Sequence, residues 1–120
     1  MPTGNPSQSP KHSYNLAVDE VAVQICGEKA NLYGFEIENN GAADIYLQIF
    51  DKLAADVTVG TTVPDFTFRC PASANFGKDS VEIPLHYHSK GITIAVTADR
   101  HGATAPVSDA TVQMWFMKGI

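Results

Sequence analysis

The sequence has little positive charge, and this excludes one large class of function. Its 120 residues carry 8 Lys and Arg against 13 Asp and Glu, which gives a formal net charge of −5. A general nucleic-acid binder needs a basic stripe that releases counterions from the phosphates. Lys and Arg form no cluster anywhere in this sequence. We therefore expect no nucleic-acid partner.

Cysteine is also scarce. Cys26 and Cys70 are the only 2 cysteines, and 44 positions separate them. They are too few for a disulfide scaffold and too far apart for a zinc knuckle. Both lie in stretches typical of strands, so we expect them to be buried free thiols.

Long apolar runs are missing as well. Apolar residues make up 44% of the sequence, but no run reaches the roughly 18 residues that a membrane-spanning helix needs. Residues 1–6 contain no positive segment followed by an apolar one, as a secretory signal would. We expect no membrane partner and a protein that is made and kept, or assembled, in the cytoplasm.

The sequence does contain a strong alternation of apolar and polar residues from residue 14 onward. A period of two is typical of strands, each with one face to bury. At 12.9 kDa the chain has the length of one domain with a single core. The alternating apolar sets are Val21, Val23 and Ile25; Tyr33, Phe35 and Ile37; Ile45, Leu47 and Ile49; Phe66, Phe68 and Cys70; Val81, Ile83, Leu85 and Tyr87; Ile92, Ile94 and Val96; and Val112, Met114 and Phe116.

Turn residues separate these segments, and Asn39-Asn40-Gly41 is the strongest signal among them. Asn-Gly favours the positive φ angles of a hairpin turn. Residues 53–56 are compatible with a single helical turn. Because no longer segment has helical periodicity, we predict an all-β chain. Its expected fold is an antiparallel β-sandwich or jelly roll of about 7–9 short strands.

Residues 1–13 differ from the rest of the chain. They contain three prolines and no apolar residue after Met1, so we predict an extended N-terminal arm that precedes a single β-sandwich domain, residues 14–120. Fully extended, such an arm spans on the order of 40 Å and reaches a neighbouring subunit. Pro6 and Pro10 are its candidate contact residues. The alternative is a frayed terminus without a role.

The last strand is apolar on both faces, because Trp115 lies opposite Met114 and Phe116. That pattern fits either a central strand under a covering loop or a face buried against another chain. Residues 98–109 form a long connection of mostly small residues. It is either a flexible tip or a binding loop of the kind that sandwiches carry.

Two histidines, His86 and His88, share one face of a strand at a spacing that metal ligands often have. A third ligand would have to come from Asp99 or His101. We favour two solvated imidazoles on the polar side of a strand that buries Leu85 and its neighbour Tyr87. A subunit contact that titrates near neutral pH is the other alternative.

No catalytic constellation stands out in the sequence. Glu36 and Glu38 share a strand face, but two carboxylates at the end of a strand more often face solvent. There is no Gly-x-Ser-x-Gly elbow and no phosphate-binding glycine loop. The loop between Asp99 and Asp109 lacks the dense acidic spacing of a calcium cage. We therefore predict no enzyme, no metal and no cofactor.

One stretch resembles a known family. Residues 32–52 contain Leu-Tyr-Gly-Phe, continue through Asn-Asn-Gly-Ala, and end Tyr-Leu-Gln-Ile-Phe-Asp-Lys. With residues 61–71, 81–84 and 91–99, this pattern resembles small bacteriophage virion proteins of the head decoration or cement type, over roughly residues 30–117. The resemblance implies a jelly-roll-like protein that binds the capsid exterior, often as a trimer. It also implies the major capsid protein and the chain itself as partners, and assembly in the host cytoplasm.

A cement protein must bury surface on neighbouring capsid subunits, and aromatic residues dominate the energetics of such contacts. We therefore predict an interface on the Trp115 side, with Tyr46 and Phe50 as further anchors. The alternative is a carbohydrate-binding or receptor-binding module of a tail fibre or spike. Such a module would carry two or three aromatic residues on one exposed face beside polar residues.

Overall fold

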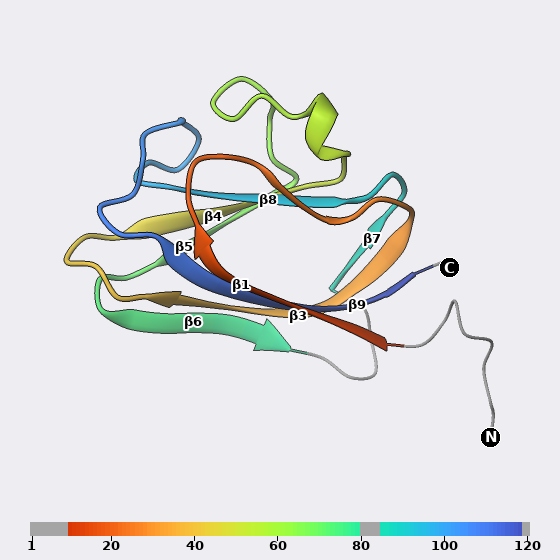
Figure 1. The fold of residues 1–120 in the computed structure, drawn as a ribbon, viewed down its shortest axis with the longest axis horizontal. Coiled ribbons are helices and arrows are strands. Elements are labelled where there is room, and N and C mark those ends of the chain that lie inside the picture. The colour runs from red at the N-terminus through yellow and green to blue at the C-terminus, as the bar shows by residue number, and fades with distance from the viewer. Residues whose placement is uncertain (1–9, 80–84, 119–120) are drawn as a thin grey trace.

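The strands in a computed structural model of the protein follow from the alternation in the sequence. The structure describes residues 10–79 and 85–118, and within these ranges it contains nine β-strands and one 3-10 turn (Figure 1). The elements are β1 (Pro10–Val18), β2 (Val23–Cys26), β3 (Ala30–Asn39), β4 (Ile45–Phe50), η2 (Ala54–Asp56), β5 (Phe66–Cys70), β6 (Ala74–Asp79), β7 (His86–His88), β8 (Ile92–Thr97) and β9 (Ala110–Lys118).

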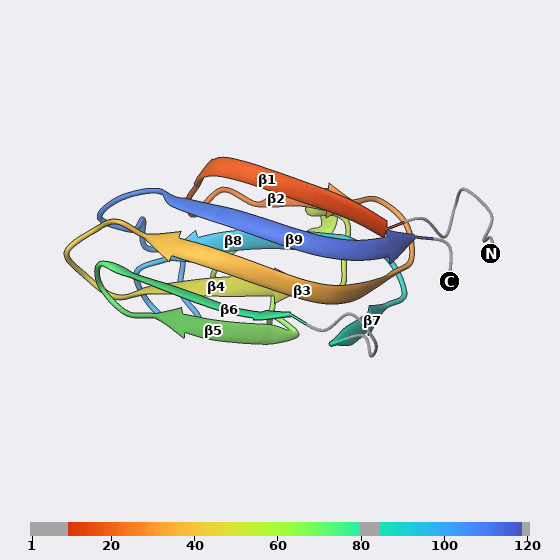
Figure 2. The same ribbon diagram turned by 90° about the horizontal axis from the view of Figure 1, so that it is seen from below.

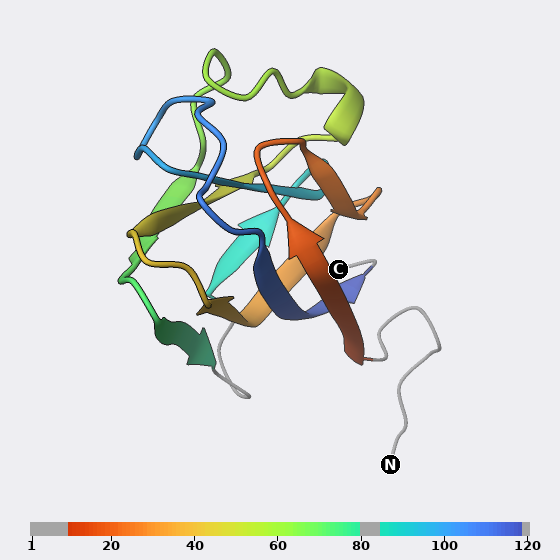
Figure 3. The same ribbon diagram turned by 60° about the vertical axis from the view of Figure 1, so that its left-hand side comes forward.

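The strands form two antiparallel sheets that face each other. Sheet A has the order β1-β9-β3-β6, with β7 also paired to β3, and sheet B has the order β2-β8-β4-β5. The pairs β4–β5, β3–β6, β2–β8 and β1–β9 are nested, as in one long hairpin that is rolled up. Figure 2 shows the two layers from below, and Figure 3 views them more nearly along the strands. The predicted sandwich is confirmed, and its topology is a jelly roll.

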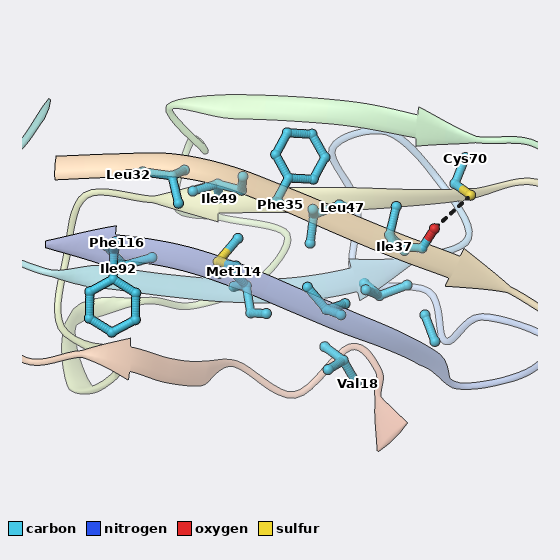
Figure 4. Packing of buried hydrophobic residues seen from close by; sticks show 14 of the residues in the cluster. Val18, Leu32, Phe35, Ile37, Leu47, Ile49, Cys70, Ile92, Met114 and Phe116 are labelled. Carbon is cyan, nitrogen blue, oxygen red and sulfur yellow. Dashed lines mark hydrogen bonds between the residues drawn. The ribbon is translucent and has the colours of Figure 1, made fainter. Parts of the chain in front are cut away.

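The core lies between the two sheets, where the predicted apolar faces meet. Ile37 of β3 and Met114 of β9 point inward from sheet A, and Leu47 of β4 and Ile94 of β8 point inward from sheet B; all four are fully buried. Figure 4 shows how these rows interdigitate. Burying such a side chain contributes about 1.5–3 kcal/mol to folding, so this layer supplies the main driving force.

A β-bulge in β3 changes which residues face the core, so one predicted face is wrong in part. We expected Tyr33 to share the buried face with Phe35, but Leu32 is buried instead and Tyr33 is only half-buried. The register of β3 against β9 shifts between Leu32 and Gly34. The extra residue moves the alternation by one position, so two residues three apart both face the core. Sequence periodicity alone cannot place such a bulge.

The predicted hairpin at Asn39-Asn40-Gly41 is wrong, because β3 and β4 lie in different sheets. Among the described residues only Ser73 and Gly60 have positive φ, at 54° and 92°. The Asn39 side chain instead holds the crossing between the layers, and its carbonyl oxygen accepts the Gly41 N–H at 2.9 Å. Its amide nitrogen donates, at 2.9–3.2 Å, to the carbonyl oxygens of Ala43, Cys70 and Pro71.

Two long connections cover the outer face of sheet B, above β4 and β8 in Figure 1. The Thr93 hydroxyl donates to the Lys52 carbonyl oxygen at 2.7 Å, and the Gln48 amide donates to the Gly102 carbonyl oxygen at 3.1 Å. The segment 98–109 therefore packs back onto the sheet. Phe50, on the outer side of β4, is fully buried.

The structure also tests the predictions for the two cysteines, the helical turn and the N-terminal arm. Cys26 and Cys70 are buried free thiols, and burial raises the pKa of the Cys70 thiol. The helical turn expected at 53–56 is present as η2. Residues 10–13, which we assigned to the arm, belong to β1 and pair with β9. The rest of the predicted arm lies outside the described residues.

Candidate functional site

The outer face of sheet A carries a group of three rings, His12, Tyr14 and Trp115, which we call the aromatic cluster. Met114 and Phe116 point into the core, so Trp115 between them points outward. His12 is the cross-strand partner of Trp115, and their rings stack at 5.1 Å between centroids and 19° between planes. Tyr14 meets His12 edge-on at 6.4 Å and is 54% exposed. The cluster joins the first strand to the last.

Polar side chains hold the cluster in place. The His12 Nε2 lies 2.9 Å from the Gln113 Oε1, and since an amide oxygen only accepts, this nitrogen carries the hydrogen. The Gln113 amide in turn donates to the Glu36 Oε1 at 3.2 Å. Opposite Trp115 on β3 stands Gly34, which has no side chain to cover the indole. The face therefore combines aromatic rings with an amide and a carboxylate.

The other predicted contact residues do not join the cluster. Tyr46 lies on β4 of sheet B, half-buried on the outer face, where the Arg100 guanidinium stands 5.0 Å from its ring centroid. Phe50 is fully buried, so its assignment to an exposed interface is wrong. Pro10 opens β1 opposite Met117, and Pro6 lies outside the described residues. Trp115 and Tyr46 thus face away from opposite sheets and form no single patch.

The two histidines of β7 point the opposite way from our expectation. His88 is fully buried and His86 is half-buried, while Leu85 and Tyr87 are 36% and 47% exposed. The His86 ring packs edge-on against Phe66 at 4.6 Å, and the two imidazole centroids also lie 4.6 Å apart. The solvated-imidazole interpretation is therefore wrong. The orientation follows from the pairing of β7 with β3.

Asp51, which follows β4, organises the turn after β7. Its carboxylate accepts the N–H groups of Ser89, Lys90 and Gly91 at 2.9–3.3 Å and the Ser89 hydroxyl at 3.0 Å. Burial acts to raise the pKa of Asp51, but these hydrogen bonds outweigh it and lower the pKa to about 2. The sequence offered no signal for this contact, since Asp51 is 38–40 positions away from its partners.

The buried His88 is held as a neutral ring. Its Nδ1 donates to the Gly91 carbonyl oxygen at 2.9 Å, which leaves the Nε2 as an acceptor without a partner in the described structure. Burial, and next the neighbouring His86, lower the pKa of His88. The Asp51 carboxylate is 3.8 Å from the Nδ1 and acts in the other direction, but more weakly.

The remaining sequence candidates do not assemble into a reactive centre in the part of the chain that the structure describes. There, no three His, Cys, Asp or Glu side chains lie close enough to hold a metal ion. Asp99 accepts a hydrogen bond from the Thr104 hydroxyl at 3.1 Å within its own loop. Residues 10–79 and 85–118 also contain no helix long and apolar enough to cross a membrane.

Comparisons with known proteins give one structural likeness. No protein-family model and no curated protein sequence matches the chain. The coat protein of Tobacco streak virus is similar in structure, with a TM-score of 0.45 and 10% sequence identity over 97% of this chain and 90% of that chain. The jelly-roll assignment rests on the strand pairing described above.

Proposed function

We propose that the chain is a non-enzymatic structural protein of a virion, and specifically a capsid decoration or cement protein of a bacteriophage. It binds the outside of the head and bridges neighbouring subunits of the major capsid protein. The motif pattern within residues 32–99 supports this proposal by its resemblance to such proteins. The jelly-roll topology agrees with it, since this fold is common in capsid proteins, although fold alone decides no function.

The aromatic cluster is the observation that carries the proposal. The cluster forms an aromatic surface made of Trp115, His12 and Tyr14. It lies on the outer face of sheet A, which the two long connections over sheet B leave uncovered (Figure 1). Trp and Tyr are the residues that most often dominate binding energy at interfaces, because they bury a large area with little loss of conformational entropy. The strand β9, which carries Trp115, is paired on both sides, with β1 and with β3.

The cluster would serve as the central contact with a capsid subunit. A stable interface buries roughly 800 Å² on each partner, more than three rings supply. The N-terminal arm, with Pro6, would add contacts on a second subunit, and Pro10 at the start of β1 would flank it, so that the protein bridges the two subunits. Self-association as a trimer would repeat the same contact around the capsid symmetry axis.

The test uses virions of the phage that encodes the chain. We expect mass spectrometry to find the protein in purified particles, and labelled protein to bind particles that lack it. Trp115→Ala should weaken this binding by about 30-fold or more, as loss of a hot-spot residue does. Tyr14→Ala, which alters a more exposed ring, should weaken it less while leaving the fold intact.

The matched control is Val63→Ala, because Val63 is 81% exposed and lies in the connection between β4 and β5. This variant should bind particles as the unchanged protein does. Absence of the protein from virions would refute the capsid role. Unchanged particle binding by a folded Trp115→Ala variant would instead refute only the assignment of the contact to the cluster.

A second function also finds support in the cluster. A carbohydrate-binding module of a tail fibre or spike needs aromatic rings beside hydrogen-bonding groups on an exposed face. Tyr14, Gln113 and Glu36 provide that combination. A glycan array would separate the two functions, because saccharide binding that Tyr14→Ala abolishes would favour the module over the cement protein.

A further inference from the structure

The two arginines of the chain meet at one tyrosine on the outer face of sheet B, although 31 positions separate them. Tyr46 of β4 is the direct cross-strand partner of Arg69 on β5, so both side chains lie on the same face of the sheet. Arg100 belongs to the connection that follows β8, and its guanidinium lies over the Tyr46 ring, 5.0 Å from the centroid. The three residues, which we call the arginine site, stand where β4 begins and β8 ends (Figure 1).

Asp44 fixes the direction of Arg69. The Arg69 Nε donates to the Asp44 Oδ2 at 2.8 Å, and the Asp44 Oδ1 accepts the Ala72 N–H at 3.1 Å. The carboxylate is therefore itself held by the backbone. A guanidinium has five N–H donors, and this contact uses one of them. Since the Arg69 side chain is 52% exposed, its terminal NH₂ groups are accessible to an acceptor from outside.

The connection that carries Arg100 is held at both ends. The Ala98 N–H donates to the Thr104 carbonyl oxygen at 2.9 Å, which closes the segment into a loop. The Gln48 amide donates to the Gly102 carbonyl oxygen at 3.1 Å, which ties the loop to β4. The tyrosine ring covers one face of the guanidinium, but the N–H donors of a guanidinium lie in its plane and so point past the ring. Arg100 is exposed, so these donors face outward.

The charges at the arginine site suit a single negative charge. Asp44 offsets the charge of Arg69, whereas Arg100 makes no ion pair within 4 Å in residues 10–79 and 85–118. The neighbouring Asp99 carboxylate accepts the Thr104 hydroxyl instead. More distant carboxylates of this acidic chain act weakly, because the Debye length is about 8 Å at physiological salt. Paired guanidinium donors match the two oxygens of a carboxylate in geometry.

We propose that the arginine site docks the carboxylate of an acidic side chain, Asp or Glu, of a protein partner. A phosphate dianion fits less well, since it would bring a second negative charge beside Asp44. An acidic saccharide also fits less well, because Arg100 already lies over the Tyr46 ring on which a sugar would stack. The site is on the opposite sheet from the aromatic cluster, so it stands independently of the proposed virion function.

The experiment titrates the protein with a tetraglutamate peptide that is blocked at both ends, and follows the amides by two-dimensional NMR. We expect saturable shifts centred on Tyr46, Arg69 and Arg100, and none with blocked tetraglutamine. Arg100→Gln should weaken the binding of tetraglutamate about fivefold, the effect of one exposed ion pair. Arg100→Lys keeps the charge but loses the planar fork, so it should recover only part of that loss.

The matched control is Lys11→Gln, which removes the same charge from an exposed position on β1 of sheet A. It should leave the binding of tetraglutamate unchanged. Inorganic phosphate and a sialylated trisaccharide test the other two kinds of anion, and each should bind the arginine site more weakly than the peptide does. The proposal is overturned if tetraglutamate causes no saturable shift at Tyr46, if Lys11→Gln weakens binding as much as Arg100→Gln, or if phosphate or the saccharide binds this site more tightly.

Discussion

Replacing Asp51 by Asn tests whether a single carboxylate holds β7 and the following turn against the end of β4. Asp51 accepts four hydrogen bonds from three consecutive residues, Ser89, Lys90 and Gly91. An asparagine side chain has only one acceptor oxygen, and its NH₂ group would face N–H donors. The substitution therefore removes both the charge and part of the hydrogen bonding while it keeps the size of the side chain.

The magnitude follows from the pKa of Asp51, which falls from 3.8 to about 2 in the folded protein. The difference is about 1.8 pH units, and at 1.36 kcal/mol per unit it corresponds to roughly 2 kcal/mol. Because the folded pKa is lowered, this stability is fully present above pH 3.8 and is lost as the pH falls toward 2. We therefore expect Asp51→Asn to lower the free energy of unfolding by about 2 kcal/mol at pH 7.

Urea unfolding followed by far-ultraviolet circular dichroism measures this difference at pH 7, 5, 4 and 3. The loss should be constant from pH 7 to 5 and should shrink between pH 4 and 3. Asp56→Asn is the matched control, since Asp56 is an exposed carboxylate in η2. It should change the stability by less than about 0.5 kcal/mol. A loss in Asp51→Asn that is equally large at every pH would refute the electrostatic reasoning.

Four further outcomes are expected from the structure. Burial lowers the pKa of His88 from 6.5, so as the pH falls the unfolded chain takes up this proton before the folded chain does. The free energy of unfolding should therefore fall as the pH drops below 6.5. In His88→Phe this contribution to the pH dependence of the free energy of unfolding should be absent. Asn39→Ala removes the donor to three carbonyl oxygens and should cost about 2–3 kcal/mol in urea unfolding. Met114→Ala should cost about 2–5 kcal/mol by the same measurement, since it leaves a cavity in the core. Gly91→Ala should lower the melting temperature in calorimetry, because its Cβ would lie 2.7 Å from the Cys26 carbonyl oxygen.

Strands that bury one face made of alternating apolar residues could be predicted from the sequence. Leu47, Ile94 and Met114 all point into the core, as the period of two indicates. The reason is local, because side chains alternate across a strand whatever it pairs with. Sequence therefore predicts the sandwich, but it does not say which strands share a sheet.

Two strands had no such signal. β1 and β6 are rich in polar residues. They stand at the two ends of the strand order of sheet A, so each has a neighbouring strand on one side only in that order. Their backbone hydrogen bonds come from β9 and β3, which are far away in sequence. We predicted residues 10–13 as part of an arm because a polar edge strand and an extended arm have the same composition.

The aromatic cluster could be predicted only in part, for the same reason. Trp115 stood out as an apolar residue on the polar side of its strand, but nothing local connects it to His12, 103 positions earlier. The pairing depends on the register of β1 against β9. A slip of one residue would turn His12 to the core side and remove the stack. The histidines of β7 show the same dependence, since their burial follows from the pairing with β3.

Because the cluster is built from the first and the last strand, it exists only when the jelly roll is closed. His12 comes from β1 and Trp115 from β9, and neither strand presents the stacked pair alone. A partner that binds the cluster therefore binds the folded chain and not the unfolded one. By mass action such a partner stabilises the closed domain by about 2.7 kcal/mol at a hundred times its dissociation constant. Stabilisation by the proposed capsid partner, and its loss in Trp115→Ala, would thus link the site directly to the topology that forms it.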